Sequence, residues 1–292
     1  MAARKPIVAG QFYPGTEKQC RSEIADCITE GPVTGKLPEK IVAGLVPHAG
    51  WTFSGDLAGM VFKAIEKANK NVDTFVIFGA THSHFGSEAA VYDKGSWFTP
   101  LGEIKIDEEL AAAITEKSKG AQANCEVHKY EHSIEVQVPF IQYIFKKAKI
   151  VPIMTSPAEY AVKLGIDVAE CIKSASDKKI VCIGSTDLTH YGPRYGFNPQ
   201  GNGEAGIKWA KDVNDRAFID LAIEMRAERV LNESMQSQSA CGPGAAAATI
   251  AAAKALGKTK GLLLAHTHSN EVMERKFNQT SKESVGYAAI VY

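Results

Sequence analysis

The sequence predicts an α/β protein: a three-layer α/β/α domain with a mixed or mostly parallel central sheet. Two observations support this prediction. Short apolar runs recur along the 292 residues, and helix-like stretches lie between them. Runs that are apolar on both faces are typical of strands in the middle of a helix-covered sheet, and such alternation is typical of layered α/β domains. Because the chain contains no internal repeat and no low-complexity linker, we expect a single domain over residues 1–292.

The predicted strands are short and rich in apolar residues. In chain order they cover residues 41–46, 75–78, 150–154, 180–183, 262–265 and 287–292. The stretches between them carry helical patterns. These cover residues 17–29, 58–69, 107–117, 135–147, 159–174, 206–225 and 245–256. Pro139 falls inside the fourth of these helices, so we expect that helix to start late or to kink.

Charge and cysteine content limit the partners and the cellular location that we expect for this protein. Lys plus Arg and Asp plus Glu both number 33, so we expect neither nucleic acid nor a membrane as the main partner. The six cysteines are irregularly spaced and form no C-x-x-C pair, which favours free thiols and a cytoplasmic location. No apolar run approaches the ~20 residues that cross a bilayer. The N-terminus lacks the apolar stretch of a signal peptide.

Histidines gather directly after predicted strands. Six of the eight are placed in this way, namely His48, His82, His84, His190, His266 and His268. In open α/β sheets, ligands bind beyond the carboxyl ends of the strands. We therefore expect one edge of the sheet to carry the functional site. For His48 and His82 the alternative is a histidine hydrogen-bonded in a buried turn, and their positions favour the site.

Cys241 joins this set from a different context. It lies immediately before an alanine-rich helix, in the sequence Ser-Ala-Cys-Gly-Pro-Gly-Ala. The positive end of a helix dipole lowers the pKa of a thiol, so we expect a thiolate that serves as metal ligand or nucleophile. The simpler alternative is a small buried apolar residue. We interpret the other five cysteines as core or surface thiols.

Several further residues have both a functional and a structural interpretation. Asp187 either caps a turn or takes part in catalysis, and His190 either acts as general acid or base or packs under a neighbouring ring. Glu131 and His132 either start a solvated helix or contact substrate in the pocket wall. Trp51 either lines a binding cleft or belongs to the core.

Five motifs occur together in one order along the chain. They are PHAGWTFSG (47–55), GATHSHFG (79–86), YEHSIEVQVPF (130–140), STDLTHYG (185–192) and ACGPGA (240–245). In this respect the sequence resembles the Memo-like family, whose prokaryotic members are called AmmeMemoRadiSam system protein B. The resemblance covers essentially the whole chain.

The resemblance implies a fold similar to that of the class III extradiol dioxygenases, which are non-haem iron enzymes. His48 and His82 match the two histidine ligands, and Cys241 falls where those enzymes have a glutamate. His190 matches the acid–base histidine, with Asp187 beside it. The resemblance thus implies a divalent metal, with Fe(II) favoured. A thiolate softens the site, so Cu or Zn is an alternative.

Two functions follow from these expectations. The first is a metal-dependent oxidoreductase, dioxygenase-like in fold, that acts on a small molecule contacted by Glu131, His132 and Trp51. The second is a non-catalytic metal-binding or peptide-binding protein, as described for eukaryotic members of the family. Covalent catalysis by Cys241 is a third, weaker alternative. The family name also implies a radical-SAM pathway partner.

Overall fold

The centre of the molecule is a block of parallel strands. The structure, a computed structural model, describes residues 3–29, 36–82 and 86–292. Four strands lie side by side and parallel, in the order β1 (Ala43–Val46), β8 (Ile180–Ser185), β2 (Thr74–Ala80) and β7 (Lys149–Thr155). Every residue of the first three is buried, which explains why their sequences are apolar on both faces.

Antiparallel strands border this block on both sides. Next to β7 lies β3 (Ala89–Val91), which pairs in parallel with β6 (Ala121–Ala123). Next to β1 lies β11 (Ser284–Val291), which pairs with β10 (Leu262–His268) and with the short β9 (His190–Tyr191). In the described part of the chain these elements form one nine-stranded mixed sheet. A separate hairpin consists of β4 (Ser96–Thr99) and β5 (Gly102–Lys105).

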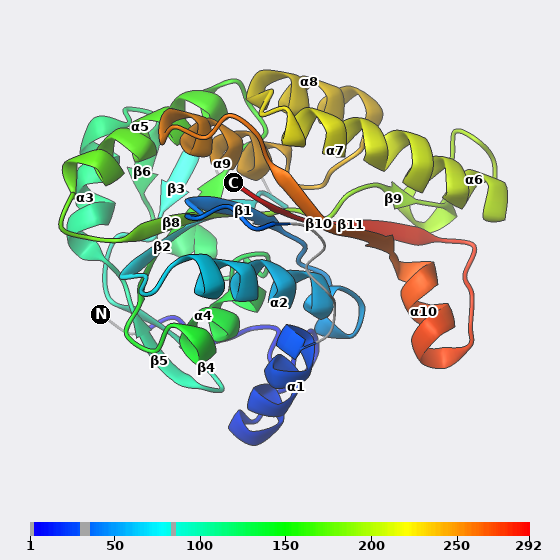
Figure 1. Cartoon of the computed structure of the whole chain (residues 1–292), viewed down its shortest axis with the longest axis horizontal. Coiled ribbons are helices and arrows are strands. Elements are labelled where there is room, and N and C mark those ends of the chain that lie inside the picture. The colour runs from blue at the N-terminus through cyan, green and yellow to red at the C-terminus, as the bar shows by residue number, and fades with distance from the viewer. Residues whose placement is uncertain (1–2, 30–35, 83–85) are drawn as a thin grey trace.

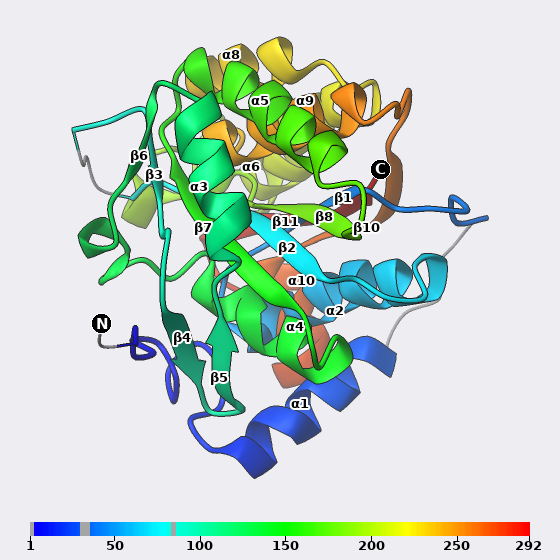
Figure 2. The ribbon, with the colours of Figure 1, turned by 90° about the vertical axis from the view of Figure 1, so that its left-hand side faces the viewer.

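Helices cover both faces of the sheet, so the predicted three-layer α/β/α fold is confirmed (Figures 1 and 2). One face carries α1 (Glu17–Thr29), α2 (Trp51–Ala68), α4 (Val138–Ile144) and α10 (Ser269–Phe277). The other carries α3 (Glu108–Lys117), α5 (Tyr160–Ser174), α7 (Arg216–Ile223), α8 (Ala227–Ser237) and α9 (Pro243–Ala255). Beyond them, α6 (Glu204–Trp209) lies at one end of the molecule in Figure 1.

Helix α9 is almost wholly buried because its side chains are small. It packs between the sheet and α5, and the contact depends on Gly165 of α5. A Cβ atom at Gly165 would lie 2.1 Å from the backbone oxygen of Ala248. The alanine-rich sequence therefore lets two helices approach more closely than larger side chains would permit.

Every predicted strand and helix is present; α1 has the predicted bounds and the others differ at one or both ends. Helix α2 starts at Trp51 rather than at residue 58. The 135–147 helix starts late, as expected, with a 3-10 turn at Glu135–Gln137 and Pro139 in the first turn of α4. The 206–225 helix is interrupted by a π-helical segment, Ala210–Asp215, between α6 and α7.

One boundary corrects the sequence analysis. We expected the strand at 262–265 to end before its histidines, but β10 extends to His268. His266 and His268 are thus part of a strand rather than of a loop that follows one. His84 lies outside the described residues.

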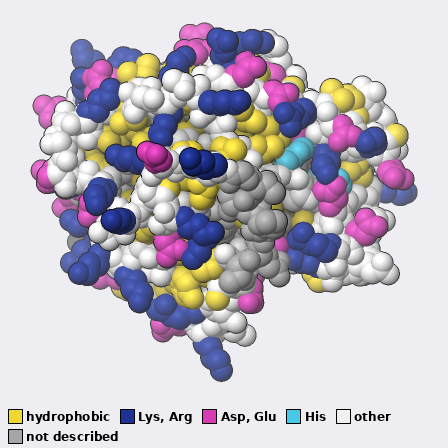
Figure 3. All heavy atoms as spheres, in the orientation of Figure 1, with side chains coloured by type: hydrophobic (Ala, Val, Ile, Leu, Met, Phe, Trp, Pro, Cys, Tyr) yellow, Lys and Arg dark blue, Asp and Glu magenta, His cyan; other side chains and the backbone are white. Residues whose placement is uncertain are grey.

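The surface agrees with the balanced composition. On the face shown in Figure 3, Lys and Arg side chains are interspersed with Asp and Glu side chains. Among the helices of the described residues, none combines the length and apolarity required to span a membrane.

Candidate metal centre

The site is built where three neighbouring parallel strands end. Because β1, β8 and β2 are adjacent and parallel, the residues that follow them meet at one edge of the sheet. His48 follows β1, Asp187 follows β8 and His82 follows β2. The chain reversal before α9 adds Cys241 to the same edge. The structure therefore brings these residues together at one edge of the sheet.

His48 is the centre of the arrangement and is held in one orientation. It is 2% exposed. Its Nδ1 lies 3.1 Å from Ser185 Oγ, and that hydroxyl donates its hydrogen to the backbone oxygen of Ser133 at 2.7 Å. Since the hydroxyl has one hydrogen, which this carbonyl accepts, we assign the His48 proton to Nδ1, which then donates to Ser185. The lone pair then lies on Nε2, which faces Cys241 Sγ at 3.2 Å.

Two more imidazoles approach His48. The ring centroids of His48 and His82 are 5.3 Å apart, and those of His82 and His132 are 4.5 Å apart and nearly parallel. Burial, together with the neighbouring histidines, holds the pKa of His48 well below its usual value. Burial also lowers the pKa values of His82 and His132. At neutral pH all three rings are neutral and present lone pairs, as metal ligands must.

The donor atoms form two overlapping groups. Among the described residues, one atom each of His48, His82 and His132 lie within 4.8 Å of one another, and the same holds for His48, Asp187 and Cys241. His48 belongs to both groups. Of the three expected ligands, His82 and Cys241 each lie close to His48, but they do not belong to the same group.

The thiol of Cys241 differs from its expected state. Its Sγ accepts a hydrogen bond from the backbone N–H of Asp187 at 3.3 Å. Burial raises the pKa of the thiol well above its ordinary value, and the nearby Asp187 carboxylate raises it further. Burial and the Asp187 charge thus oppose the lowering of this pKa that was expected from the helix N-terminus. A bound cation would reverse this balance.

Asp187 and His190 form a second layer of the site. Asp187 Oδ1 accepts the backbone N–H groups of His48 at 2.7 Å and Ala49 at 3.3 Å. Its Oδ2 lies 3.9 Å from His190 Nε2, a buried atom that has no hydrogen-bond partner in the described structure. Burial raises the pKa of Asp187 to about 7 and, with the nearby His82, lowers that of His190 to about 4. These hydrogen bonds join Asp187 to the loop after β1 rather than capping its own turn, and its catalytic role stays a prediction.

The loop that carries Glu131 and His132 is fastened to the strand ends. Glu131 is buried, and its carboxylate accepts the hydroxyl of Ser133 and the backbone N–H of Ile134. The N–H of Ala80, at the end of β2, donates to Ser133 Oγ at 3.0 Å. Glu131 therefore stabilises its own loop rather than a solvated helix start, and its contact with substrate stays a prediction.

Trp51 is a packing residue in this structure. Its indole N–H donates to the backbone oxygen of Val136 at 3.0 Å. Its ring lies against Phe140 at 4.6 Å and Tyr13 at 5.1 Å between centroids. Since the side chain is only 2% exposed, its burial disfavours the substrate contact predicted for it.

His266 and His268 belong to another cluster. His266 Nε2 lies 3.1 Å from Asp215 Oδ2, and His268 Nε2 lies 3.8 Å from Glu271 Oε1. Neither histidine shares a donor group with His48 among the described residues. The sequence analysis correctly predicted the edge of the sheet at which they lie, but they are separate from the site.

Two cavities adjoin the site. The first, of about 390 Å³, is bordered by Cys241 and His190. Its remaining lining carries no formal charge and comes from Pro157, Leu188, Tyr195, Ser234, Met235, Gln238, Ala240 and Pro243. The second, of about 630 Å³, is bordered by His82 and the polar residues around it. A small molecule in either cavity would therefore lie next to one of the candidate ligands, Cys241 or His82.

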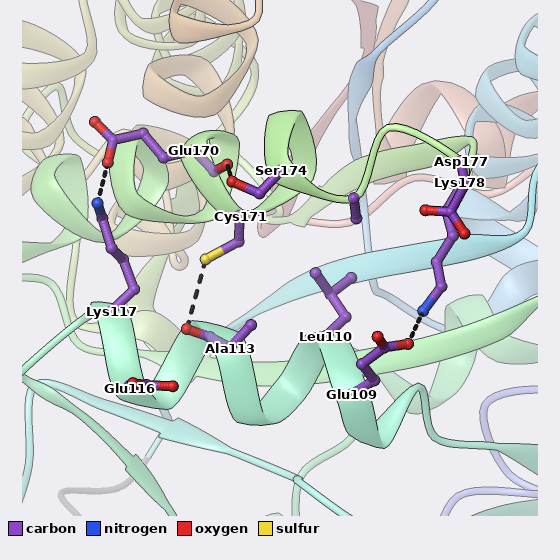
Figure 4. A pocket seen from close by; sticks show the side chains of 11 residues that line it. Glu109, Leu110, Ala113, Glu116, Lys117, Glu170, Cys171, Ser174, Asp177 and Lys178 are labelled. Atoms are coloured by element: carbon purple, nitrogen blue, oxygen red, sulfur yellow. Dashed lines mark hydrogen bonds and ion pairs between the residues drawn. The ribbon is translucent and has the colours of Figure 1, made fainter.

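A third cavity, a groove between α3 and α5, is unrelated to the site (Figure 4). Ion pairs of Lys117 with Glu170 and of Lys178 with Glu109 cross it. Lys178 lies just before β8, at the amino end of the parallel strands. The groove shares no lining residue with the two cavities beside His82 and Cys241.

Together, the layered sheet and its imidazole–thiol edge define an α/β/α protein with a metal-capable centre. Residues 4–291 match the family described as Memo-like protein. The chain therefore belongs to the Memo-like family, and the predicted resemblance is confirmed.

Relatives of similar sequence match this chain along nearly its full length. A "MEMO1 family protein" from Thermococcus onnurineus is 38% identical and covers 99% of both chains. A relative with the same family name from Pyrococcus abyssi is 39% identical over 99% of this chain and 98% of its own. A solved structure of an uncharacterized protein from Escherichia coli K12 covers 85% of this chain and 99% of its own, with 10% identity and a TM-score of 0.45.

Proposed function

We propose that this protein is a metal-dependent oxidoreductase that acts on a small molecule, with His48, His82 and Cys241 as metal ligands. One observation carries the proposal. The unprotonated Nε2 of His48 faces the sulfur of Cys241 at 3.2 Å, with the ring of His82 beside it. A buried imidazole lone pair directed at a thiol, next to further imidazoles, is a typical set of donors for a transition metal.

The side chains around the donors suit such an ion. The hydrogen bond from His48 Nδ1 to Ser185 fixes the ligand nitrogen, as second hydrogen bonds commonly do for metal-binding histidines. Fe(II) is the metal we favour, with Cu or Zn as alternatives for a site that contains sulfur. When bound, the metal supplies a Lewis acid and, for iron or copper, a redox centre. A cytoplasmic setting, in which the Cys241 thiol stays reduced, is part of the proposal.

His190 and Asp187 would manage protons beside the ligands. His190 is neutral at pH 7 and its Nε2 has no hydrogen-bond partner in the described structure, so it is able to accept a proton from substrate. Asp187 Oδ2, at 3.9 Å, would orient the ring and stabilise it when protonated. The cavity lined by Cys241 and His190 would hold the substrate.

The test separates metal binding from turnover. Protein purified without oxygen is loaded with Fe(II), its metal content is measured, and oxygen uptake is followed with catechols and hydroxy acids. His190→Ala is expected to bind metal normally and lose uptake, whereas His48→Ala is expected to lose the metal. Equal uptake by wild type and His190→Ala, or no uptake by fully loaded wild type, would contradict the proposal.

The second candidate is a metal-binding or peptide-binding protein without turnover, and one observation favours it. The hydrogen bonds from the backbone N–H groups of His48 and Ala49 account for Asp187 without any catalytic role. A pure binder tolerates changes at His190 in every assay. The radical-SAM pathway partner implied by the family name is part of either proposal, and co-purification from native cells would test it.

A further inference from the structure

We infer that His132 is an additional protein ligand of the metal ion, beside His48, His82 and Cys241. The inference rests on the proposed function, since it concerns the same centre. It changes the role of His132 from a substrate contact to a donor. It also changes the predicted donor set from two nitrogens and one sulfur to three nitrogens and one sulfur.

The geometry of the rings carries the inference. His132 lies 4.5 Å from His82 and 5.6 Å from His48 between ring centroids, and it stands perpendicular to the His48 ring. One ring nitrogen from each of these three histidines falls within a common 4.8 Å. Ligands about 2.0–2.1 Å from one ion are separated by about 3–4 Å, so small side-chain rotations would bring all three nitrogens to it.

The loop beneath His132 is rigid in a way that a ligand requires. The residue that follows it, Ser133, accepts a hydrogen bond from Ala80 at the end of β2 and, through its backbone oxygen, another from Ser185 at the end of β8. Gln137 completes the connection by donating to the backbone oxygen of Pro47, at the end of β1, at 2.8 Å. The loop is thus fastened to all three strands whose ends supply the site.

The chemistry of the rings points the same way. In the part of the chain that the structure describes, no hydrogen bond engages the ring nitrogens of His82 or His132, although both rings lie against other side chains. His82 is exposed and His132 is half-buried, so their ring nitrogens are open to an ion at this edge of the sheet. Neighbouring imidazoles of this kind are an ordinary set of ligands for a transition metal ion. Three nitrogens and a sulfur would fill a tetrahedral site, or leave two positions open on a six-coordinate ion.

The experiment counts ligands without relying on activity. Metal-free protein is loaded anaerobically with Co(II), and X-ray absorption measures the number of coordinated imidazoles, while chelator competition measures affinity. We expect three imidazoles in wild type and two in His132→Ala, with affinity lowered about a hundredfold or more, since losing even an outer-shell partner costs about 10–100-fold. His268→Ala, which removes a histidine outside the site, is the matched control.

Each outcome decides the inference. An unchanged imidazole count and affinity in His132→Ala would overturn it, while the proposed function would stand if His48→Ala still abolished binding. A wild-type protein that binds no metal would overturn both. Because His132→Ala could unfold, circular dichroism accompanies the titration, and added imidazole is expected to restore affinity to this variant alone. Failure of that rescue in a folded variant would also count against ligation.

Discussion

The ionisation of Asp187 makes a quantitative prediction about stability. Its carboxyl group is 4% exposed, and burial raises its pKa from the ordinary value of 3.8 to about 7. Between these two pH values Asp187 is therefore more protonated in the native state than in the unfolded state, so its contribution to the free energy of unfolding falls as the pH rises through that range. Since one pKa unit corresponds to about 1.4 kcal/mol, ionisation of Asp187 costs the native state up to about 4 kcal/mol.

Asp187→Asn isolates this effect. Asparagine retains an oxygen to accept the N–H groups of His48 and Ala49, but it does not ionise. Urea unfolding of the metal-free proteins from pH 4 to pH 8 is the assay, with the difference between wild type and variant taken at each pH. This difference cancels the histidines, which titrate in both proteins. We expect the variant to gain stability relative to wild type as the pH rises, and parallel curves would refute the reasoning.

Three further substitutions test the packing and the polar connections. Gly165→Ala places a Cβ against the backbone of α9 and is expected to destabilise the protein by about 1–3 kcal/mol or more, measured by urea unfolding. Glu135→Gln removes the buried partner of Arg4, and we expect a loss of about 3–5 kcal/mol in the same assay. Ser185→Ala removes the hydrogen bond that fixes the His48 tautomer and is expected to lower metal affinity about 10–100-fold in a chelator competition.

For each of these three substitutions, one outcome would contradict the prediction. A Gly165→Ala protein as stable as wild type would mean that α5 and α9 separate without loss of packing. A neutral Glu135→Gln change would show that the remaining hydrogen bonds satisfy the guanidinium without the carboxylate. Unchanged metal affinity in Ser185→Ala would mean that His48 reaches its ligand orientation without that hydroxyl.

The central strands and the site edge were predictable because their signals are local. Strands such as β2 are buried on both faces and are therefore uniformly apolar, which a single sequence displays. The residues after them, His48 and His82, follow directly from that assignment. Strands of three residues, such as β3 and β6, have no such signal, because their pairing depends on neighbours distant in the sequence.

The remaining properties of the site arise from tertiary contacts. His132 follows no strand, and tertiary hydrogen bonds, such as those of Ser133 to two strand ends, hold it beside His82. The ionisation of Cys241 also depends on tertiary contacts. Its position before a helix is a local feature, whereas the burial and the Asp187 charge that raise its pKa depend on the assembled fold.

The contacts of Arg4 have a practical consequence for work on this protein. Its guanidinium donates to Glu135 and to the backbone oxygens of His128 and Glu131, which belong to the segment that carries His132. Glu135 in turn accepts the backbone N–H of Ile7. A deletion or an N-terminal fusion that displaces Arg4 or Ile7 would remove these contacts and disturb the loop that carries His132. Measurements of metal content are therefore best made on protein whose N-terminus has been left unaltered.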